Sequence, residues 1–270
     1  MWVASRLLAD RYSKGRVYLI GDACHLHPPF GGFGMNMGIA DGVDLGWKLA
    51  AVLDGWGGDA LLDSYEHERR FVHDYVMDEA EANHALIPST LTRPNLADDT
   101  PEGEAARAEA GAFIRDHKAA EFYALGVILG YCYATSPIIV DDGTVADWVR
   151  SRDYVPQAIP GCLAPHRWLA DGRSLYDSFG QGFTLLVLDE GVGVDHAVEE
   201  ARRAGVPLNV VIHYDADLQA LYGASLAVIR PDQHIAWRGN VWASGIIDRV
   251  TGRSASADVE QVPRRLVSAG

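Results

Sequence analysis

Cysteine is scarce in this sequence, with three in 270 residues. The three are Cys24, Cys132 and Cys162, which are widely spaced and odd in number. Such a set does not form the paired framework of a small secreted domain, so we expect free thiols in a reducing compartment. A chain of this length with 48% hydrophobic residues can also bury a core without disulfides.

Long apolar runs and a surplus of basic residues are also missing. The longest apolar run, 122–134, is interrupted by glycine and tyrosine, which indicates a buried strand or core helix and not a membrane span. No charged-then-apolar secretory signal is visible. With 23 basic and 37 acidic residues the net charge is −14, which argues against nucleic acid or an anionic membrane as partner. We therefore expect a cytoplasmic protein.

The segment from Gly15 to Asn36 carries the most informative motif. Arg16 to Ile20 is a β-branched and aromatic run typical of a buried strand, and Gly21-Asp22 at its end would deliver a carboxylate to a crevice. The next loop has prolines that stiffen it and glycines that let its backbone approach a flat ligand: Pro28, Pro29, Gly31, Gly32 and Gly34.

A helix should start at the end of this motif. Asn36 is the expected cap, and the free amides of Gly34, Met35 and Asn36 would favour an electron-rich carbonyl or a developing anion. Such a site is built from backbone, so it suits a cofactor better than a nucleophile. An apolar stripe at helical spacing then predicts the buried face: Ile39, Val43, Trp47, Ala50 and Ala51.

A second helix is predicted from Leu61 to Leu86, after the glycines at 55–58. Its charged side chains Glu66, Glu68, Arg69 and Arg70 are interpreted as a solvated face with weak ion pairs.

Four blocks in this order, 15–25, 28–39, 44–50 and 61–70, closely resemble single-component flavoprotein aromatic hydroxylases. The resemblance is strongest to the branch of phenol, dichlorophenol and hydroxyphenylpropionate hydroxylases and of polyketide and indolocarbazole oxygenases. It implies that NADPH or NADH reduces FAD, which then uses dioxygen to hydroxylate a phenolic or polycyclic aromatic ring. The chain would thus be a cytoplasmic oxidoreductase of the FAD-binding monooxygenase class.

The resemblance also implies residue roles. Asp22, next to Gly21, would bind the ribityl chain of FAD, and the loop from Pro28 through Gly31 and Gly32 would line the flavin ring. The amides from Gly34 to Asn36, including Met35, would meet its pyrimidine carbonyl. Phe33 stands where many relatives carry a polar residue and would change the polarity beside the flavin. No catalytic side chain can be named, and no metal is expected.

A full family member begins with a Gly-x-Gly-x-x-Gly turn that holds the FAD pyrophosphate, and this chain has no such turn. The resemblance therefore implies the C-terminal half of a longer hydroxylase, with FAD and an aromatic substrate shared with an N-terminal half. A homodimer is also compatible with it. The alternatives left open are a shortened non-catalytic homologue that binds, dimerises or stabilises, and an autonomous protein with other chemistry in the same crevice.

The middle of the chain is predicted as a loop over 87–101, a helix over 102–123 and short strands from Leu125 to Val140. A regular alternation follows. We expect strands at 183–188 and 208–213, helices at 194–204 and 216–222, a hairpin of 225–230 with 234–238, and a last helix at 257–267.

This order matches a thioredoxin-like fold, as found at the C-terminus of the phenol hydroxylase branch. No Cys-x-x-Cys is present, so a structural or dimer-forming role is favoured over dithiol exchange. The fold class is therefore α/β, with the C-terminal part of an FAD-binding domain over 1–88, a linker and middle region over 89–155 and a thioredoxin-like domain over 156–270.

Several tempting residues have plainer interpretations. His25 and His27 with Asp22 lack a third ligand at motif spacing, so local hydrogen bonding is favoured over a metal. His213 and His234 fit satisfied core or surface histidines. Two larger groups are interpreted likewise, as serines without a nucleophile-elbow context and as core tryptophans: Ser174, Ser178 and Ser225, and Trp47, Trp56 and Trp168.

Overall fold

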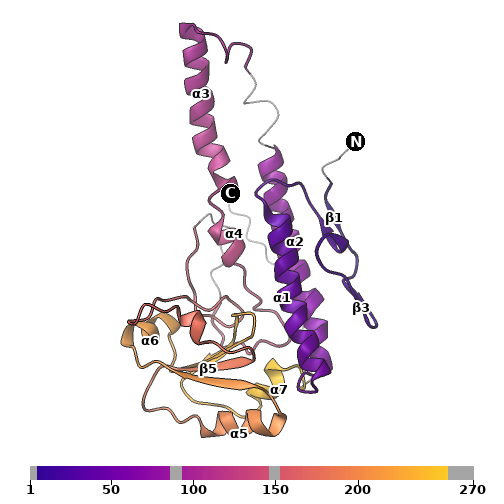
Figure 1. Ribbon diagram of the computed structural model, residues 1–270, viewed down its shortest axis with the longest axis vertical. Coiled ribbons are helices and arrows are strands. Elements are labelled where there is room, and N and C mark those ends of the chain that lie inside the picture. Colours follow the sequence, from indigo (N-terminus) through magenta and orange to yellow (C-terminus); the bar gives the residue numbers. More distant parts are fainter. Residues whose placement is uncertain (1–4, 86–92, 146–152, 255–270) are drawn as a thin grey trace.

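The computed structural model describes residues 5–85, 93–145 and 153–254. Figure 1 shows short N-terminal strands beside two long helices, a helical middle region and an α/β unit at the lower end. None of the helices within these ranges combines the length and apolar character that a membrane span requires.

The N-terminal strands form two small antiparallel pairs. β1 (Leu7–Leu8) pairs with β4 (His25–Leu26), and β2 (Ser13–Lys14) pairs with β3 (Val17–Tyr18). The strand expected from Arg16 to Ile20 is therefore two residues long, and the expectation that it is buried was wrong. Val17 is 65% exposed and Ile20 45% exposed, because a two-stranded hairpin has no third layer to cover it within the described chain.

The first long helix, α1 (Phe33–Leu53), begins three residues before the expected cap. Gly32 is the N-cap, in a left-handed conformation with φ of 66°. Asn36 lies inside the first turn, where its Nδ2 donates to the Gly32 carbonyl at 3.0 Å. The prediction of Asn36 as cap was wrong because its side chain bonds to a carbonyl and leaves the first amides free.

The buried face of α1 also differs from the predicted stripe. Ile39 is 57% exposed and Val43 is 52% exposed, whereas Asp41, Asp44 and Lys48 are buried. The helix turns its charged side chains inward because each of them meets an opposite charge there.

The second long helix, α2 (Asp59–Ala85), lies alongside α1 (Figure 1). Its expected span is confirmed over the described residues, and Leu86 lies outside them. The prediction that Glu68 and Arg69 are solvated was wrong, since both are at most 1% exposed. Their charges are neutralised by partners on α1 and on the C-terminal unit.

The middle region is more helical than expected. α3 (Pro101–His117) and the 3-10 turn η2 (Lys118–Glu121) confirm the predicted helix, and Thr100 caps it by accepting from the Gly103 amide. Strands were expected from Leu125, but α4 (Leu125–Leu129) is helical and irregular chain follows it. That part of the prediction was wrong. The linker expected over 87–101 is described only from residue 93 onward.

The C-terminal unit holds a four-stranded sheet in the order β6-β5-β7-β8. Its strands are β5 (Phe183–Val187), β6 (Leu208–Ile212), β7 (Leu226–Ile229) and β8 (Ile235–Gly239). β5 and β6 are parallel and the other pairs antiparallel, which gives the thioredoxin-like arrangement.

Helices complete this unit. α5 (Asp195–Ala204) and α6 (Ala216–Tyr222) form as predicted, and η3 (Leu175–Ser178) precedes β5. α7 (Ile246–Val250) was not predicted, and the helix expected at 257–267 lies outside the described residues.

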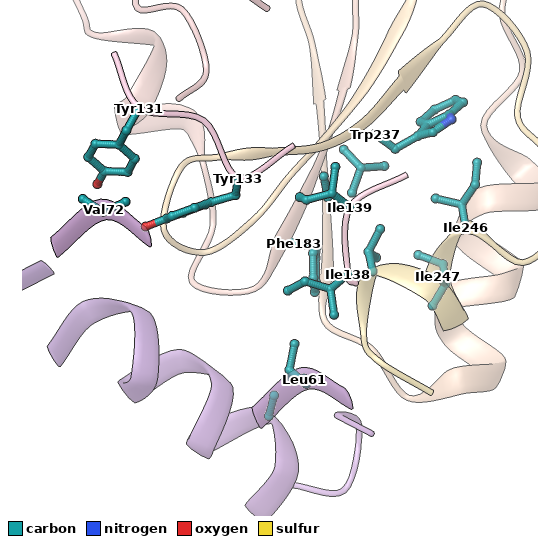
Figure 2. Close-up of a cluster of buried hydrophobic side chains, with 14 of the residues drawn as sticks. Leu61, Val72, Tyr131, Tyr133, Ile138, Ile139, Phe183, Trp237, Ile246 and Ile247 are labelled. Atoms are coloured by element: carbon teal, nitrogen blue, oxygen red, sulfur yellow. The ribbon is translucent and has the colours of Figure 1, made fainter. Parts of the chain in front are cut away.

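One apolar core joins the helices to the sheet. Figure 2 shows Leu61 and Val72 of α2 facing the C-terminal unit, with Tyr133 and Ile138 of the connecting segment between them. At the edge of this core the start of α2 touches the end of α7, where the Gly58 amide donates to the Thr251 carbonyl at 2.8 Å.

A buried ion network supplements this core. Arg230, in the turn after β7, donates to Glu68 of α2 at 2.7 Å and to Asp44 of α1 at 3.0 Å. Lys48 bridges the same two carboxylates at 2.7 and 2.8 Å, and Asp232 holds the other side of the Arg230 guanidinium. Three carboxylates thus meet two cations without solvent, so one of the carboxylates is favoured in its neutral form.

Asp44 is that carboxylate. Burial, together with the charges of Glu68 and Asp232, raises the pKa of Asp44 from 3.8 to about 7, against the opposing charges of Lys48 and Arg230.

We predict that Asp44 makes the protein less stable as the pH rises from about 4 to about 7. An acid with a raised pKa in the folded state binds more protons folded than unfolded in that window, so unfolding free energy falls with pH. In Asp44→Asn this component should vanish, flattening the profile by on the order of 1–4 kcal/mol relative to the unsubstituted chain. Urea unfolding across the window measures it, and parallel profiles would contradict the assignment.

Candidate functional site

The Gly21-Asp22 turn lies directly on α1. It forms the 3-10 turn η1 (Gly21–Ala23), in which Gly21 has φ of 58°. A Cβ at Gly38 of α1 would lie only 3.4 Å from the Gly21 Cα, so the two glycines allow the turn and the helix to approach closely. Asp22 is exposed at this turn, as the sequence predicts.

Asp41 of α1 fixes the position of the turn. Its carboxylate accepts hydrogen bonds from the Gly21 amide (2.9 Å), from His25 Nε2 (2.9 Å) and from Arg69 Nε (2.8 Å), and it pairs with His73 Nε2 at 2.9 Å. These partners come from the Gly21-Asp22 turn, from β4 and from α2. One buried carboxylate therefore ties three elements to α1.

The protonation states follow from this arrangement. Burial alone would raise the pKa of Asp41, but hydrogen bonds from His25 and His73 and the charge of Arg69 hold it well below its usual range. Burial lowers the pKa of His73 to about 4, so the ring is neutral near pH 7. Its Nε2–H then donates to Asp41, and its Nδ1 accepts from the Tyr12 hydroxyl at 2.6 Å.

The loop before α1 is shaped by its glycines. Gly31 has φ of 88°, and a Cβ there would collide with the Phe33 ring. Pro28 is buried and Pro29 is exposed. The Phe30 ring stacks on His84 of α2, with ring centroids 4.9 Å apart.

The first turn of α1 presents the free amides of Phe33, Gly34 and Met35, since no side chain caps it. Met35 is 75% exposed and so lies at the surface of the described chain. The Phe33 side chain is 1% exposed and packs into the core, so only its backbone can face a ligand.

Four potential metal ligands do converge here, although not those considered from the sequence. Atoms of Cys24, His25, Asp41 and His73 lie within 4.8 Å of one another, and Asp22 is not in this group. The Arg69 guanidinium already pairs with Asp41, and a second cation would be repelled there. His25 therefore serves hydrogen bonding. His27 Nδ1 contacts the Pro28 carbonyl at 2.9 Å.

Three other sequence interpretations can be checked. His234 is buried and lines a cavity of about 180 Å³ with Tyr131, and its Nε2 has no hydrogen-bond partner in the described parts of the chain. Trp168 is 69% exposed, so its placement in the core was wrong. Ser174 caps η3 and also contacts His166 Nε2 at 2.9 Å.

Sequence reasoning missed Asp41, Arg69, His73 and Tyr12. A signal was present in the charges at positions 41, 44 and 48, which share one face of a helix that otherwise reads as amphipathic.

Two family models match the chain. One, described as an FAD binding domain, matches residues 1–80, and the other, described as aromatic-ring hydroxylase, C-terminal, matches residues 157–259. Among curated proteins, the FAD-dependent monooxygenase apdD of Emericella nidulans is 34% identical over 97% of this chain and 44% of its own length. The 4-methyl-5-nitrocatechol 5-monooxygenase of a Burkholderia species is 35% identical over 88% of this chain and 42% of its own length.

Solved structures agree with these matches. The rebeccamycin biosynthetic enzyme RebC with reduced flavin superposes with a TM-score of 0.83 and 39% identity, over 92% of this chain and 47% of that one. The fold of this chain is therefore that of the flavin monooxygenases. The chain matches the C-terminal part of FAD-dependent aromatic-ring hydroxylases and spans less than half the length of these relatives.

We predict that Asp41 and Asp22 differ sharply in their contribution to stability. Asp41→Asn leaves Arg69 buried without its counter-charge, which should lower the free energy of unfolding by about 3–5 kcal/mol. The matched change Asp22→Asn, at an exposed position of the same turn, should stay within about 0.5 kcal/mol. Urea unfolding followed by circular dichroism measures both, and equal losses would overturn the distinction.

Proposed function

We propose that the chain forms part of an FAD-dependent monooxygenase that hydroxylates a phenolic or polycyclic aromatic substrate. The observation that carries the proposal is the packing of the turn that bears the exposed Asp22 on α1, where Asp41 holds the Gly21 amide and the first amides of the helix have no side-chain cap. A carboxylate that accepts from sugar hydroxyls and an amide end that meets a carbonyl are complementary to the two ends of a flavin and its ribityl chain.

The chain's own residues would bind and orient the cofactor. Asp22 would accept from the ribityl hydroxyls, and the amides of Gly34 and Met35 would donate to the pyrimidine carbonyl. The rigid backbone from Pro28 to Gly32 would line one side of the ring and exclude water from it. FAD, reduced by NADPH or NADH, would supply the oxygen-transfer chemistry. The catalytic side chain stays unassigned.

Exposed apolar side chains support the proposed N-terminal partner segment. Eight large hydrophobic residues between positions 5 and 53, the described part of this segment, are exposed: Leu7, Val17, Ile20, Leu26, Met35, Ile39, Val43 and Leu53. Such a concentration is typical of a surface covered by another part of a protein. Ile39 is exposed on the outer face of α1, where the sequence pattern predicts burial, whereas Val43 is half exposed at the cavity that His234 and Tyr131 line. A segment that completes the FAD-binding domain would provide that burial.

The proposal leads to a direct reconstitution. The chain is produced alone and together with the polypeptide encoded immediately upstream, or as the continuous product if the two are joined. Alone it should bind FAD weakly, whereas the assembly should hold flavin and couple NAD(P)H oxidation to hydroxylation of a phenol, as measured by product mass. Stoichiometric flavin on the chain alone, or a colourless assembly, would contradict the proposal. The second result would favour the non-catalytic homologue.

We predict that Asp22→Ala weakens FAD binding in that assembly by about 10- to 100-fold, because a charged hydrogen-bond acceptor is lost. Asp54→Ala is the control, since Asp54 is exposed at the opposite end of α1. Fluorescence titration with FAD measures both, and an unchanged affinity in Asp22→Ala would refute the role of this carboxylate.

We also predict that Ile39→Glu, at a position 57% exposed, leaves the chain folded but weakens its association with the N-terminal segment by at least about tenfold, since a charge would enter an apolar contact. Val241→Glu is the matched control, because Val241 is 78% exposed on the C-terminal unit. Sedimentation or titration calorimetry gives the affinities. Equal effects of the two substitutions would mean that the outer face of α1 is not the interface.

The cytoplasmic location and the homodimer expected from the sequence stay predictions.

A further inference from the structure

Cys132 and Cys162 lie side by side although 30 residues separate them in sequence. Their Sγ atoms are 2.7 Å apart. Cys132 is 8% exposed and Cys162 is 7% exposed, and Ile159 completes an apolar cluster around them. This distance is shorter than an ordinary contact between two sulfurs, although both cysteines are free thiols.

The backbone explains why the two sulfurs meet. Cys132 and Cys162 are partners in an antiparallel bridge, and the Tyr133 amide donates to the Gly161 carbonyl at 2.8 Å beside them. This is the pattern of a non-hydrogen-bonded pair, in which the Cα atoms lie about 4.5 Å apart and the side chains come closest. That Cα separation falls within the range that a disulfide spans.

Two further contacts hold the pair in register. Gly161 has φ of 93°, and a Cβ there would lie 2.6 Å from the Ala134 amide nitrogen, so the two segments approach at a position that requires glycine. On the other side, Ile235 of β8 donates its amide to the Cys162 carbonyl at 2.9 Å. The pair is therefore held by the sheet and does not depend on the flexibility of two side chains.

We propose that Cys132 and Cys162 form a site of disulfide formation, with a small peroxide as the oxidant. In the first step the Cys162 thiol loses its proton, the thiolate attacks one peroxide oxygen, the O–O bond breaks to leave a sulfenic acid, and the departing hydroxide takes up that proton as water. In the second step the Cys132 sulfur attacks the sulfenic sulfur, loses its proton and expels a second water as the S–S bond forms. Two thiols and one hydrogen peroxide thus give one disulfide and two waters.

The direction of attack follows from the surroundings of the two thiols. The hydrogen bond from Cys132 and the charge of Arg238 lower the pKa of Cys162 below its ordinary value. The contact with Cys162 and burial raise the pKa of Cys132. Because both sulfurs are shielded, a small oxidant reaches them more readily than a protein dithiol. The inference is independent of the hydroxylase function, since neither cysteine touches the proposed flavin site.

The remaining cysteine provides an internal control. Cys24 is buried in the N-terminal cluster with Tyr12 and Tyr65, away from the other two. The full chain is treated with hydrogen peroxide, quenched, unfolded and alkylated with a maleimide, and its intact mass is recorded. We expect one adduct after oxidation and three after reduction with dithiothreitol, with the oxidised chain two hydrogens lighter before alkylation. Peptide mapping should link Cys132 to Cys162.

The variants make the outcome decisive. In Cys24→Ala, oxidation should remove both reactive thiols and raise the thermal midpoint, because the cross-link closes a loop. In Cys132→Ala no disulfide should form and the thermal midpoint should not rise, and Cys162 should instead gain oxygen as a sulfenic acid that no second thiol resolves. For the unsubstituted chain, three maleimide adducts after oxidation, a gain of oxygen with no disulfide, or a disulfide between two chains would each overturn the proposal.

Discussion

Burial of two carboxylates on one helix is the constraint on which this structure depends. Asp41 and Asp44 both point from α1 into the protein, where an unpaired charge would be strongly unfavourable. Each is therefore surrounded by donors from other elements. Asp41 binds the Gly21 amide and Arg69, and Asp44 binds Lys48 and Arg230. α1 is thereby fixed to the Gly21-Asp22 turn on one side and to the C-terminal unit on the other.

This arrangement explains why local patterns predicted some parts of the fold and not others. The strands and helices from Phe183 to Gly239 were predictable, because each is a short apolar or amphipathic run with a turn at its end. The buried face of α1 was not, because Arg230, which pairs with Asp44 of α1 and Glu68 of α2, lies 186 and 162 residues from them in the sequence. A helical periodicity in the sequence cannot indicate a contact between residues so far apart along the chain. The apolar pattern at Ile39 and Val43 instead reports a surface that the described chain leaves open.

The candidate site shows the same division. Gly21, Gly31 and Gly32 adopt positive φ angles, and the need for such angles at these turns is visible in the sequence as glycine. The helix start was misplaced because asparagine is both a good cap and a good first-turn residue, and only the backbone decides between them. The approach of Cys132 to Cys162 could not be predicted, because it depends on which irregular segment pairs with the edge of β8.

The charge network also gives the thioredoxin-like unit a structural role that does not require a dithiol motif. Without Arg230, Lys48 alone would face the carboxylates of Asp44 and Glu68 inside the protein, and burial would force protons onto them or open the helix pair to water. The turn between β7 and β8 inserts a guanidinium that pairs with both, and Asp232 holds that guanidinium in place. The sheet thus acts as the rigid support that delivers Arg230 to α1. In this role the unit needs no Cys-x-x-Cys motif, because it keeps α1 at a fixed position under the Gly21-Asp22 turn, where we propose the flavin site.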